Sequence, residues 1–143
     1  MPKMVFINLP VRDVRKSTEF YLSLGATKDD RFSDETGSCI VFSDTIFVMA
    51  LSHEKFRQFT PKEIADARRS TEVLVAMSCD SRDEVDEMIE RAVSAGGKAD
   101  PGPKQDYGFM YGRSFEDLDG HIFEVMWMDV EAAMRAFGKD NAA

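Results

Sequence analysis

The chain has 143 residues, of which 43% are hydrophobic and 31% charged, a balance typical of a folded domain rather than a disordered chain. Its formal net charge of −8 argues against nucleic acid and anionic membranes as partners, and no apolar run approaches the ~20 residues that span a bilayer. We therefore expect a soluble, cytoplasmic protein.

The first half of the chain predicts a strand, a helix and further strands, in that order. Residues 4–11 (MVFINLPV) alternate with a period of two, which is typical of a strand. Asp13 is predicted to cap a helix that ends at Gly25. Residues 31–52 then predict two or three short strands.

The second half repeats this order. Residues 71–79 (TEVLVAMSC) alternate as the opening strand does, and Ser81 with Glu84 matches a capping box. The helix that follows has an apolar stripe and is stopped by Gly96; the stripe consists of Val85, Met88, Ile89, Ala92 and Val93. Residues 107–127 predict two strands joined by an acidic turn.

The chain therefore contains two copies of one βαβββ unit, offset by about 70 residues. We expect a single domain over residues 1–143, made of module one (about 3–52), a connector (about 53–69), module two (about 70–128) and a helical tail (129–143). In the connector, Thr60, Pro61 and Glu63 match a capping box and predict a short helix. In the tail, Asp129 is predicted to cap a helix with four residues facing inward, namely Val130, Ala133, Met134 and Phe137.

Glu124 is the one carboxylate within an apolar strand, and it raises the question of what it binds. Strand alternation places Phe123 and Trp127 on the opposite face, as core. A buried carboxylate without a partner costs several kcal/mol, so it normally has a hydrogen-bond donor, a metal or water. We favour a hydrogen bond from a neighbouring tyrosine, arginine or water, with a metal as the alternative.

Tyr107, Phe109, Tyr111 and Arg113 alternate along one strand, so all four can face the same way. In a functional interpretation they form a pocket wall for a planar or anionic ligand. In a structural interpretation they cover the sheet or form part of a dimer interface. The residues leave both interpretations open.

The remaining polar and sulfur-containing groups predict structural roles. Cys39 and Cys79 lie in apolar runs without metal-ligand spacing, and we expect buried thiols. His121 lies an odd number of residues from Glu124 and is a poor co-ligand. The acids of the turn (EDLDG) do not fit an EF-hand, and we expect them to be solvated turn formers.

Two motifs carry a family resemblance. Asn8–Gly25 (NLPVRDVRKSTEFYLSLG) and Tyr111–Val125 (YGRSFEDLDGHIFEV) resemble the opening and closing motifs of the glyoxalase, bleomycin-resistance and extradiol-dioxygenase group, the vicinal-oxygen-chelate superfamily. Leu118 stands where proline is usual. Over Val5–Met128, the resemblance implies an α+β fold in which two βαβββ modules form a curved mixed sheet with an open hollow for the ligand and helices on the outer face. It also implies a homodimer.

The resemblance further implies four metal-binding positions, two from each module. The first falls on Phe6, which binds no metal, and the last on Glu124. One lies within residues 45–52, where the nearest candidate is the soft thioether of Met49. At most two of the four positions keep a metal-binding side chain.

The fourth position depends on how the two modules are aligned. It falls on Glu72 if residues 72–77 parallel residues 6–11, or on Leu74 if Asp13 is matched to Ser81.

We therefore predict a protein that binds a small, partly apolar molecule in the hollow, without the full metal chelate and without a cofactor. The predicted ligand-binding residues are Phe6, Asn8, Met49, Leu74, Tyr107, Tyr111, Arg113 and Met126. The alternative is a divalent-metal-dependent lyase, isomerase or dioxygenase of glyoxalase type. In that enzyme Glu72 and Glu124 would both bind the metal ion, or one of them would act as general base. Glu124 is the candidate catalytic residue.

Overall fold

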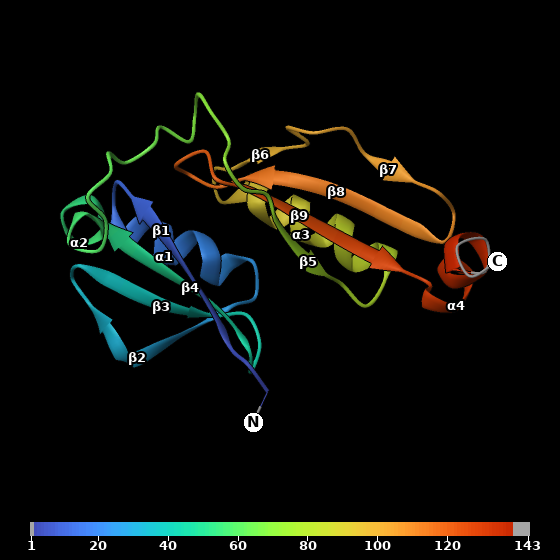
Figure 1. Cartoon of the computed structure of the whole chain (residues 1–143), viewed down its shortest axis with the longest axis horizontal. Coiled ribbons are helices and arrows are strands. Elements are labelled where there is room, and N and C mark those ends of the chain that lie inside the picture. The colour runs from blue at the N-terminus through green and yellow to red at the C-terminus, as the bar shows by residue number, and fades with distance from the viewer. Residues whose placement is uncertain (1, 139–143) are drawn as a thin grey trace. The chain divides into compact units, whose positions relative to one another are not determined.

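The computed structural model describes residues 2–138 and divides into two compact units (Figure 1). The first unit comprises the described residues up to Ser70 together with Leu118–Gly120, and the second comprises Thr71–Asp117 and the described residues from His121 onward. Each unit contains one mixed sheet with helices, which confirms the predicted α+β class and the repeated βαβββ order.

The first unit follows the predicted order of elements. Its strands lie in the order β1-β4-β3-β2, with β1 parallel to β4 and the other pairs antiparallel. The elements are β1 (Val5–Val11), α1 (Val14–Ser23), β2 (Thr27–Asp34), β3 (Gly37–Val41), β4 (Ile46–Ser52) and α2 (His53–Arg57).

Helix α1 covers one face of this sheet because its sequence gives it a cap, a stop and one apolar side. The Asp13 carboxylate accepts a hydrogen bond from the Lys16 amide, and Gly25 follows the helix with φ 100°. Phe20 and Tyr21 are fully buried against the sheet residues that face α1, which are Leu9, Val11, Ile40, Val48 and Ala50. The opposite sheet face, which carries no helix of the βαβββ module, is called the open face below.

The second unit has the same arrangement, with strand order β5-β9-β8-β6 and the short β7 paired to β8. Strands β5 and β9 are parallel, and the pairs that involve β8 are antiparallel. The elements are β5 (Val75–Ser78), α3 (Arg82–Ser94), β6 (Lys98–Ala99), β7 (Gln105–Asp106), β8 (Met110–Glu116), β9 (Ile122–Met128), α4 (Val130–Ala133) and the single π-helical turn η1 (Met134–Gly138).

Helix α3 lies across β8 and β9 (Figure 1) and begins at the predicted cap. The Ser81 hydroxyl accepts a hydrogen bond from the Glu84 amide at 3.1 Å, and the Glu84 carboxylate accepts one from the Asp80 amide. The predicted stripe is buried at three positions, Val85, Ile89 and Ala92, whereas Val93 is 48% exposed. Beneath them lie Phe115, Phe123 and Val125, all fully buried.

Two predicted helices are corrected. No helix follows Thr60, because its hydroxyl accepts a hydrogen bond from the Lys62 amide and closes a turn, where a capping box requires the Glu63 amide. The connector helix is instead α2, capped by Ser52 through the Lys55 amide.

The tail helix begins at its predicted cap, Asp129, but buries only Ala133 among the four predicted residues. Val130, Met134 and Phe137 are more than half exposed, because this short helix lies at the end of the unit rather than against a sheet face.

Among residues 2–138, no helix is long and apolar enough to cross a membrane. Cys39 and Cys79 are buried free thiols, as predicted, and burial raises the pKa of both, that of Cys79 to about 11.

Candidate functional site

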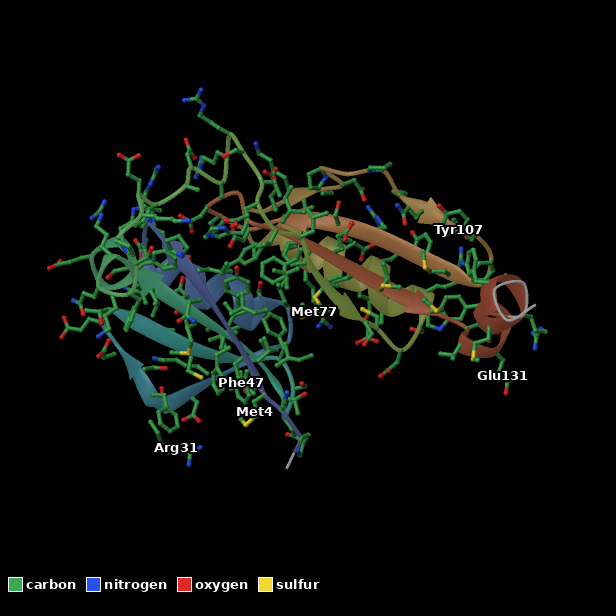
Figure 2. The ribbon with its side chains drawn as sticks, in the orientation of Figure 1. Met4, Arg31, Phe47, Met77, Tyr107 and Glu131 are labelled. Atoms are coloured by element: carbon green, nitrogen blue, oxygen red, sulfur yellow. The ribbon has the colours of Figure 1, made fainter. Side chains whose placement is uncertain are left out.

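The open face of the first sheet carries three of the predicted ligand-binding residues. Phe6 and Asn8 of β1 are directly paired with Phe47 and Met49 of β4, and directly paired residues share a sheet face. The side chains that face α1 are the intervening residues of the same strands, so these four point away from the helix. Phe47, labelled in Figure 2, was not among the predicted residues, although alternation with Met49 would have identified it.

Aromatic side chains dominate this face. The rings of Phe6 and Phe47 are stacked with centroids 4.7 Å apart and an interplanar angle of 11°. Phe6 is nevertheless 49% exposed, which is unusual for so large an apolar side chain within a sheet. The Asn8 amide nitrogen donates a hydrogen bond to the Phe6 carbonyl at 3.3 Å, which fixes the amide on this face.

Glu124 lies on the open face of the second sheet. It pairs with Ser114 of β8 and Ala76 of β5, whereas its neighbours Phe123 and Val125 face α3. Glu124 is half-buried and lines a shallow pocket of about 60 Å³ together with Pro103, Gln105, Met110, Gly112, Arg113, Ser114, Val125 and Met126.

The Glu124 carboxylate has no protein donor of the kind we expected. Among residues 2–138, no side chain or backbone amide hydrogen-bonds to it or forms an ion pair with it. Met126 lies beside it on the same face and also lines the pocket. A half-buried carboxylate in a pocket with a mixed polar and apolar lining therefore presents acceptor oxygens to whatever enters.

Tyr111 and Arg113 direct their side chains to the opposite face of the second sheet, although Arg113 also borders the Glu124 pocket. They pair with Trp127 and Val125, so both side chains lie on the face covered by α3. Alternation along one strand does not determine how its faces match those of the next strand, which depends on the pairing register.

On the helix face, Tyr111 and Arg113 form a polar network with α3. Arg113 makes a bidentate ion pair with Asp100, with nitrogen–oxygen distances of 3.1 and 2.7 Å, and also donates to Asp86 at 3.0 Å. The Tyr111 hydroxyl donates to the same Asp86 oxygen at 2.7 Å. Composition gave no indication of Asp86 or Asp100 as partners, because the packing of α3 brings Asp86 to this strand and the pairing of β6 with β8 brings Asp100.

These contacts shift the acid–base equilibria of the groups involved. The hydrogen bond from Arg113 lowers the pKa of Asp100, and the bond from Tyr111 lowers the pKa of Asp86. The Tyr111–Asp86 bond in turn raises the pKa of the tyrosine. The Arg82 guanidinium lies 4.5 Å from the centre of the Tyr111 ring and forms an ion pair with Asp106.

The other predicted residues lie outside the two strand faces. Tyr107, labelled in Figure 2, lies in the turn before β8; it is 58% exposed and stacked at 6.1 Å on Phe109. Leu74 and Glu72 precede β5 and are exposed.

The helix caps decide how the two modules align. Phe6 precedes the cap Asp13 by seven residues, and Leu74 precedes the cap Ser81 by the same number. The metal-binding position that the family resemblance implies in the second module therefore falls on Leu74, the second of the two alignments considered above.

The same alignment makes Met49 the counterpart of Glu124. Asn8 and Ala76 each lie five residues before their caps, and they pair with Met49 and Glu124 respectively. Thioether, aromatic and aliphatic side chains do not bind hard divalent ions, so this donor set does not fit the metal. Residues 2–138 also contain no group of three or more His, Cys, Asp or Glu side chains that could hold a metal ion.

The acidic turn has a structural role, but its acids are not all solvated as predicted. Asp117 is 5% exposed, and its carboxylate accepts a hydrogen bond from the His121 amide at 2.8 Å. Within the first unit, Asp119 accepts hydrogen bonds from the Arg12 amide and the Ser17 hydroxyl.

Comparison with known proteins places these observations in a family. The sequence model of the Glyoxalase/Bleomycin resistance protein/Dioxygenase superfamily matches residues 3–125. No curated protein matches the chain.

Three solved structures illustrate the fold similarity. A hypothetical protein from S. aureus is 24% identical with a TM-score of 0.73, covering 89% of this chain and 94% of its own. A glyoxalase/bleomycin resistance protein/dioxygenase family enzyme from Burkholderia phytofirmans PsJN is 16% identical with a TM-score of 0.71, covering 89% and 99%. A fosfomycin resistance protein from Listeria monocytogenes, in complex with Mn(II) and sulfate, is 20% identical with a TM-score of 0.68, covering 96% and 98%.

Proposed function

The chain belongs to the Glyoxalase/Bleomycin resistance protein/Dioxygenase superfamily, and from this we propose that it binds a small, partly apolar molecule without the metal chelate of the family's active members. One observation carries the proposal. Of the four metal-binding positions that the resemblance implies, only Glu124 keeps a metal-binding side chain, while the others are Phe6, Met49 and Leu74.

The pocket around Glu124 defines the polar part of such a molecule. Its volume of about 60 Å³ equals roughly two water molecules, enough for a small head group but not for a whole ligand. The carboxylate offers only acceptor oxygens, so the head group is cationic or a hydrogen-bond donor. A net charge of −8 favours the approach of cations over anions.

The surroundings of the pocket define the apolar part. Pro103, Met110 and Met126 line it, and methionine side chains adapt to ligands of different shape. Gly112 leaves the floor of the pocket without a side chain between Gln105 and Met126, with which it is paired on either side.

The experiment compares benzylamine with benzyl alcohol, which share a ring and differ in the charge of the head group. Binding is measured by calorimetry on wild type, Glu124→Gln and Gly112→Leu. We expect benzylamine to bind roughly tenfold or more tighter than the alcohol, because hydrogen bonds to charged groups contribute about 1.5–3 kcal/mol. Glu124→Gln removes this preference.

Gly112→Leu should weaken the binding of both compounds by filling the pocket. The variant should still fold, because a Cβ at this position meets its nearest atoms at the ordinary distances of 3.7 and 3.8 Å. Glu116→Gln is the matched control, because Glu116 is another carboxylate on the open face of β8 that does not line the pocket. Equal affinity of the two compounds for wild type would contradict the proposal.

The alternative, a metal-dependent enzyme, gives the opposite result in a second measurement. Melting curves are recorded for wild type and Glu124→Gln with and without Mn(II) or chelator. We expect neither Mn(II) nor chelator to shift the melting curve of either protein, since Glu72 lies outside β5 and Glu124 is the only metal-binding side chain at the four implied positions. Stabilisation of wild type alone by Mn(II) would overturn our proposal.

We further propose a cytoplasmic homodimer. Phe6 and Leu74 are about half exposed, and large apolar groups exposed in this way are often covered by a partner, most commonly in two-fold symmetric dimers. Two free cysteines suit a reducing compartment. Sedimentation of a 16.1 kDa species at micromolar concentration would contradict the dimer.

A further inference from the structure

A second pocket lies within the first unit, beside α2 and β1, and shares no lining residue with the pocket of Glu124. It has a volume of about 490 Å³ and is lined by Asn8, Phe56, Phe59 and Thr60. This volume falls within the range of about 300–1,000 Å³ that is typical of small-molecule sites. Three of the four lining residues belong to the connector, which sequence patterns did not associate with binding.

Local structure explains why two phenylalanines line the pocket. Ser52 caps α2 directly after β4, and the chain continues as a turn in which the Phe59 amide donates to the Phe56 carbonyl at 3.0 Å. Residues three apart in such a turn lie on the same side. Because α2 contacts β1 and β4, that side faces Asn8.

The rings offer an accessible aromatic surface. Phe59 is 69% exposed, and the Lys55 ammonium lies 5.6 Å from the centre of its ring. A cation held at this distance lies over one face of the ring and leaves the other face available for stacking.

The polar atoms of the pocket have defined hydrogen-bonding capacity. The Asn8 amide nitrogen donates to the Phe6 carbonyl, so the amide oxygen remains available as an acceptor. The Thr60 hydroxyl oxygen accepts from the Lys62 amide at 3.1 Å, which leaves its proton available to donate. The pocket therefore offers one acceptor and one donor beside two rings.

We propose that this pocket binds an uncharged, planar aromatic molecule that carries an N–H or O–H group. The ring stacks on Phe56 and Phe59, and the N–H or O–H group donates to the Asn8 amide oxygen. A cationic ligand is disfavoured, because none of the four lining residues carries a negative charge that would replace its lost hydration and the Lys55 ammonium lies beside the Phe59 ring. This preference is opposite to that of the Glu124 pocket, so the two proposals succeed or fail independently.

The test uses indole, which has an N–H donor, and 1-methylindole, which has the same ring system without it. Each compound is titrated at millimolar concentration into ¹⁵N-labelled protein, and amide chemical shifts are followed by NMR. We expect indole to shift the resonances of Asn8, Phe56, Phe59 and Thr60. Indole should bind roughly 2- to 10-fold more tightly than 1-methylindole, the contribution of one hydrogen bond.

Three variants separate the components of the site. Phe59→Ala should weaken both compounds by about tenfold or less, the value of one aromatic contact, whereas Phe32→Ala should change neither. Phe32 is the matched control because it is 65% exposed in the same unit but does not line the pocket. Asn8→Ala should abolish the preference for indole, and Glu124→Gln should leave it intact.

Two results would overturn the proposal. One is the absence of shifts at these four residues, or shifts that respond equally to Phe32→Ala and Phe59→Ala. The other is movement of the same resonances with protein concentration in the absence of indole, which would assign this surface to a second copy of the chain.

Discussion

Replacing Arg113 by methionine tests whether the polar network between β8 and α3 stabilises the second unit. The Arg113 side chain is 14% exposed, and its partners Asp100 and Asp86 are 24% and 44% exposed. Methionine fills much of the same volume without charge, so the variant leaves two carboxylates without their shared cation.

The magnitude follows from the exposure of each partner. Removing one member of a buried ion pair costs about 3–5 kcal/mol, whereas surface pairs contribute about 0–1 kcal/mol. The pair with Asp100 is close to a buried ion pair. The pair with Asp86 is closer to a surface pair, because solvent screens Asp86. We therefore expect Arg113→Met to lower the free energy of unfolding by about 3 kcal/mol.

Arg15 provides an exposed control within the same chain. It pairs with Glu19 at 3.4 Å, and the two side chains are 89% and 66% exposed. Arg15→Met should leave the free energy of unfolding unchanged within error. Urea denaturation at neutral pH measures both variants, and equal losses would refute the argument that burial determines the strength of these pairs.

The stabilisation should also depend on pH in a defined direction. Both carboxylates have a lowered pKa in the folded state, from an ordinary value of 3.8, so their contribution is fully present above that value. It is lost as the pH falls below 3.8 and through the lowered pKa values. The difference between wild type and Arg113→Met should therefore shrink in acid, and a constant difference down to pH 2 would contradict this linkage.

Three further predictions concern the scaffold. Gly120→Ala should destabilise the protein by about 2 kcal/mol or more, because Gly120 has φ 95° and a Cβ there would lie 2.9 Å from the Arg68 amide nitrogen. Gly108 is the control: it has φ 79° with open space around it, so Gly108→Ala should cost only about 1 kcal/mol. Equal melting temperatures of the two variants would contradict a steric clash at Gly120. Ser81→Ala should cost about 1 kcal/mol in urea unfolding, through loss of the α3 cap. Cys79 should react with iodoacetamide at pH 8 about 100-fold more slowly in the folded protein than in urea, because folding raises its pKa from 9.0 to about 11. Comparable rates in the two states would refute its burial.

The sequence alone determined the elements whose signals are local. Asp13, Ser81 and Asp129 cap helices as predicted, because an N-cap bond joins residues only three positions apart. Strand alternation likewise placed Phe123 and Glu124 on opposite faces of β9, since this follows from strand geometry.

Thr60 shows the limit of local signals. Its capping-box pattern was present, yet its hydroxyl accepts from the Lys62 amide, and the observed helix is capped eight residues earlier by Ser52. A short helix gains little from its own hydrogen bonds, so packing of α2 against β1 and β4 decided where the connector became helical.

Only the tertiary structure decided which groups surround Glu124. In the β8–β9 hairpin, odd-numbered residues pair with odd-numbered residues, so Arg113 lies opposite Val125, and its guanidinium bonds to Asp86 and Asp100 rather than to the Glu124 carboxylate. A register one residue different would have exchanged the faces, and the turn between the strands sets that register. Residue spacing along one strand carries no information on this choice. It shows which residues of that strand share a face, but only the pairing of the strands decides which residues of the next strand lie on the same face.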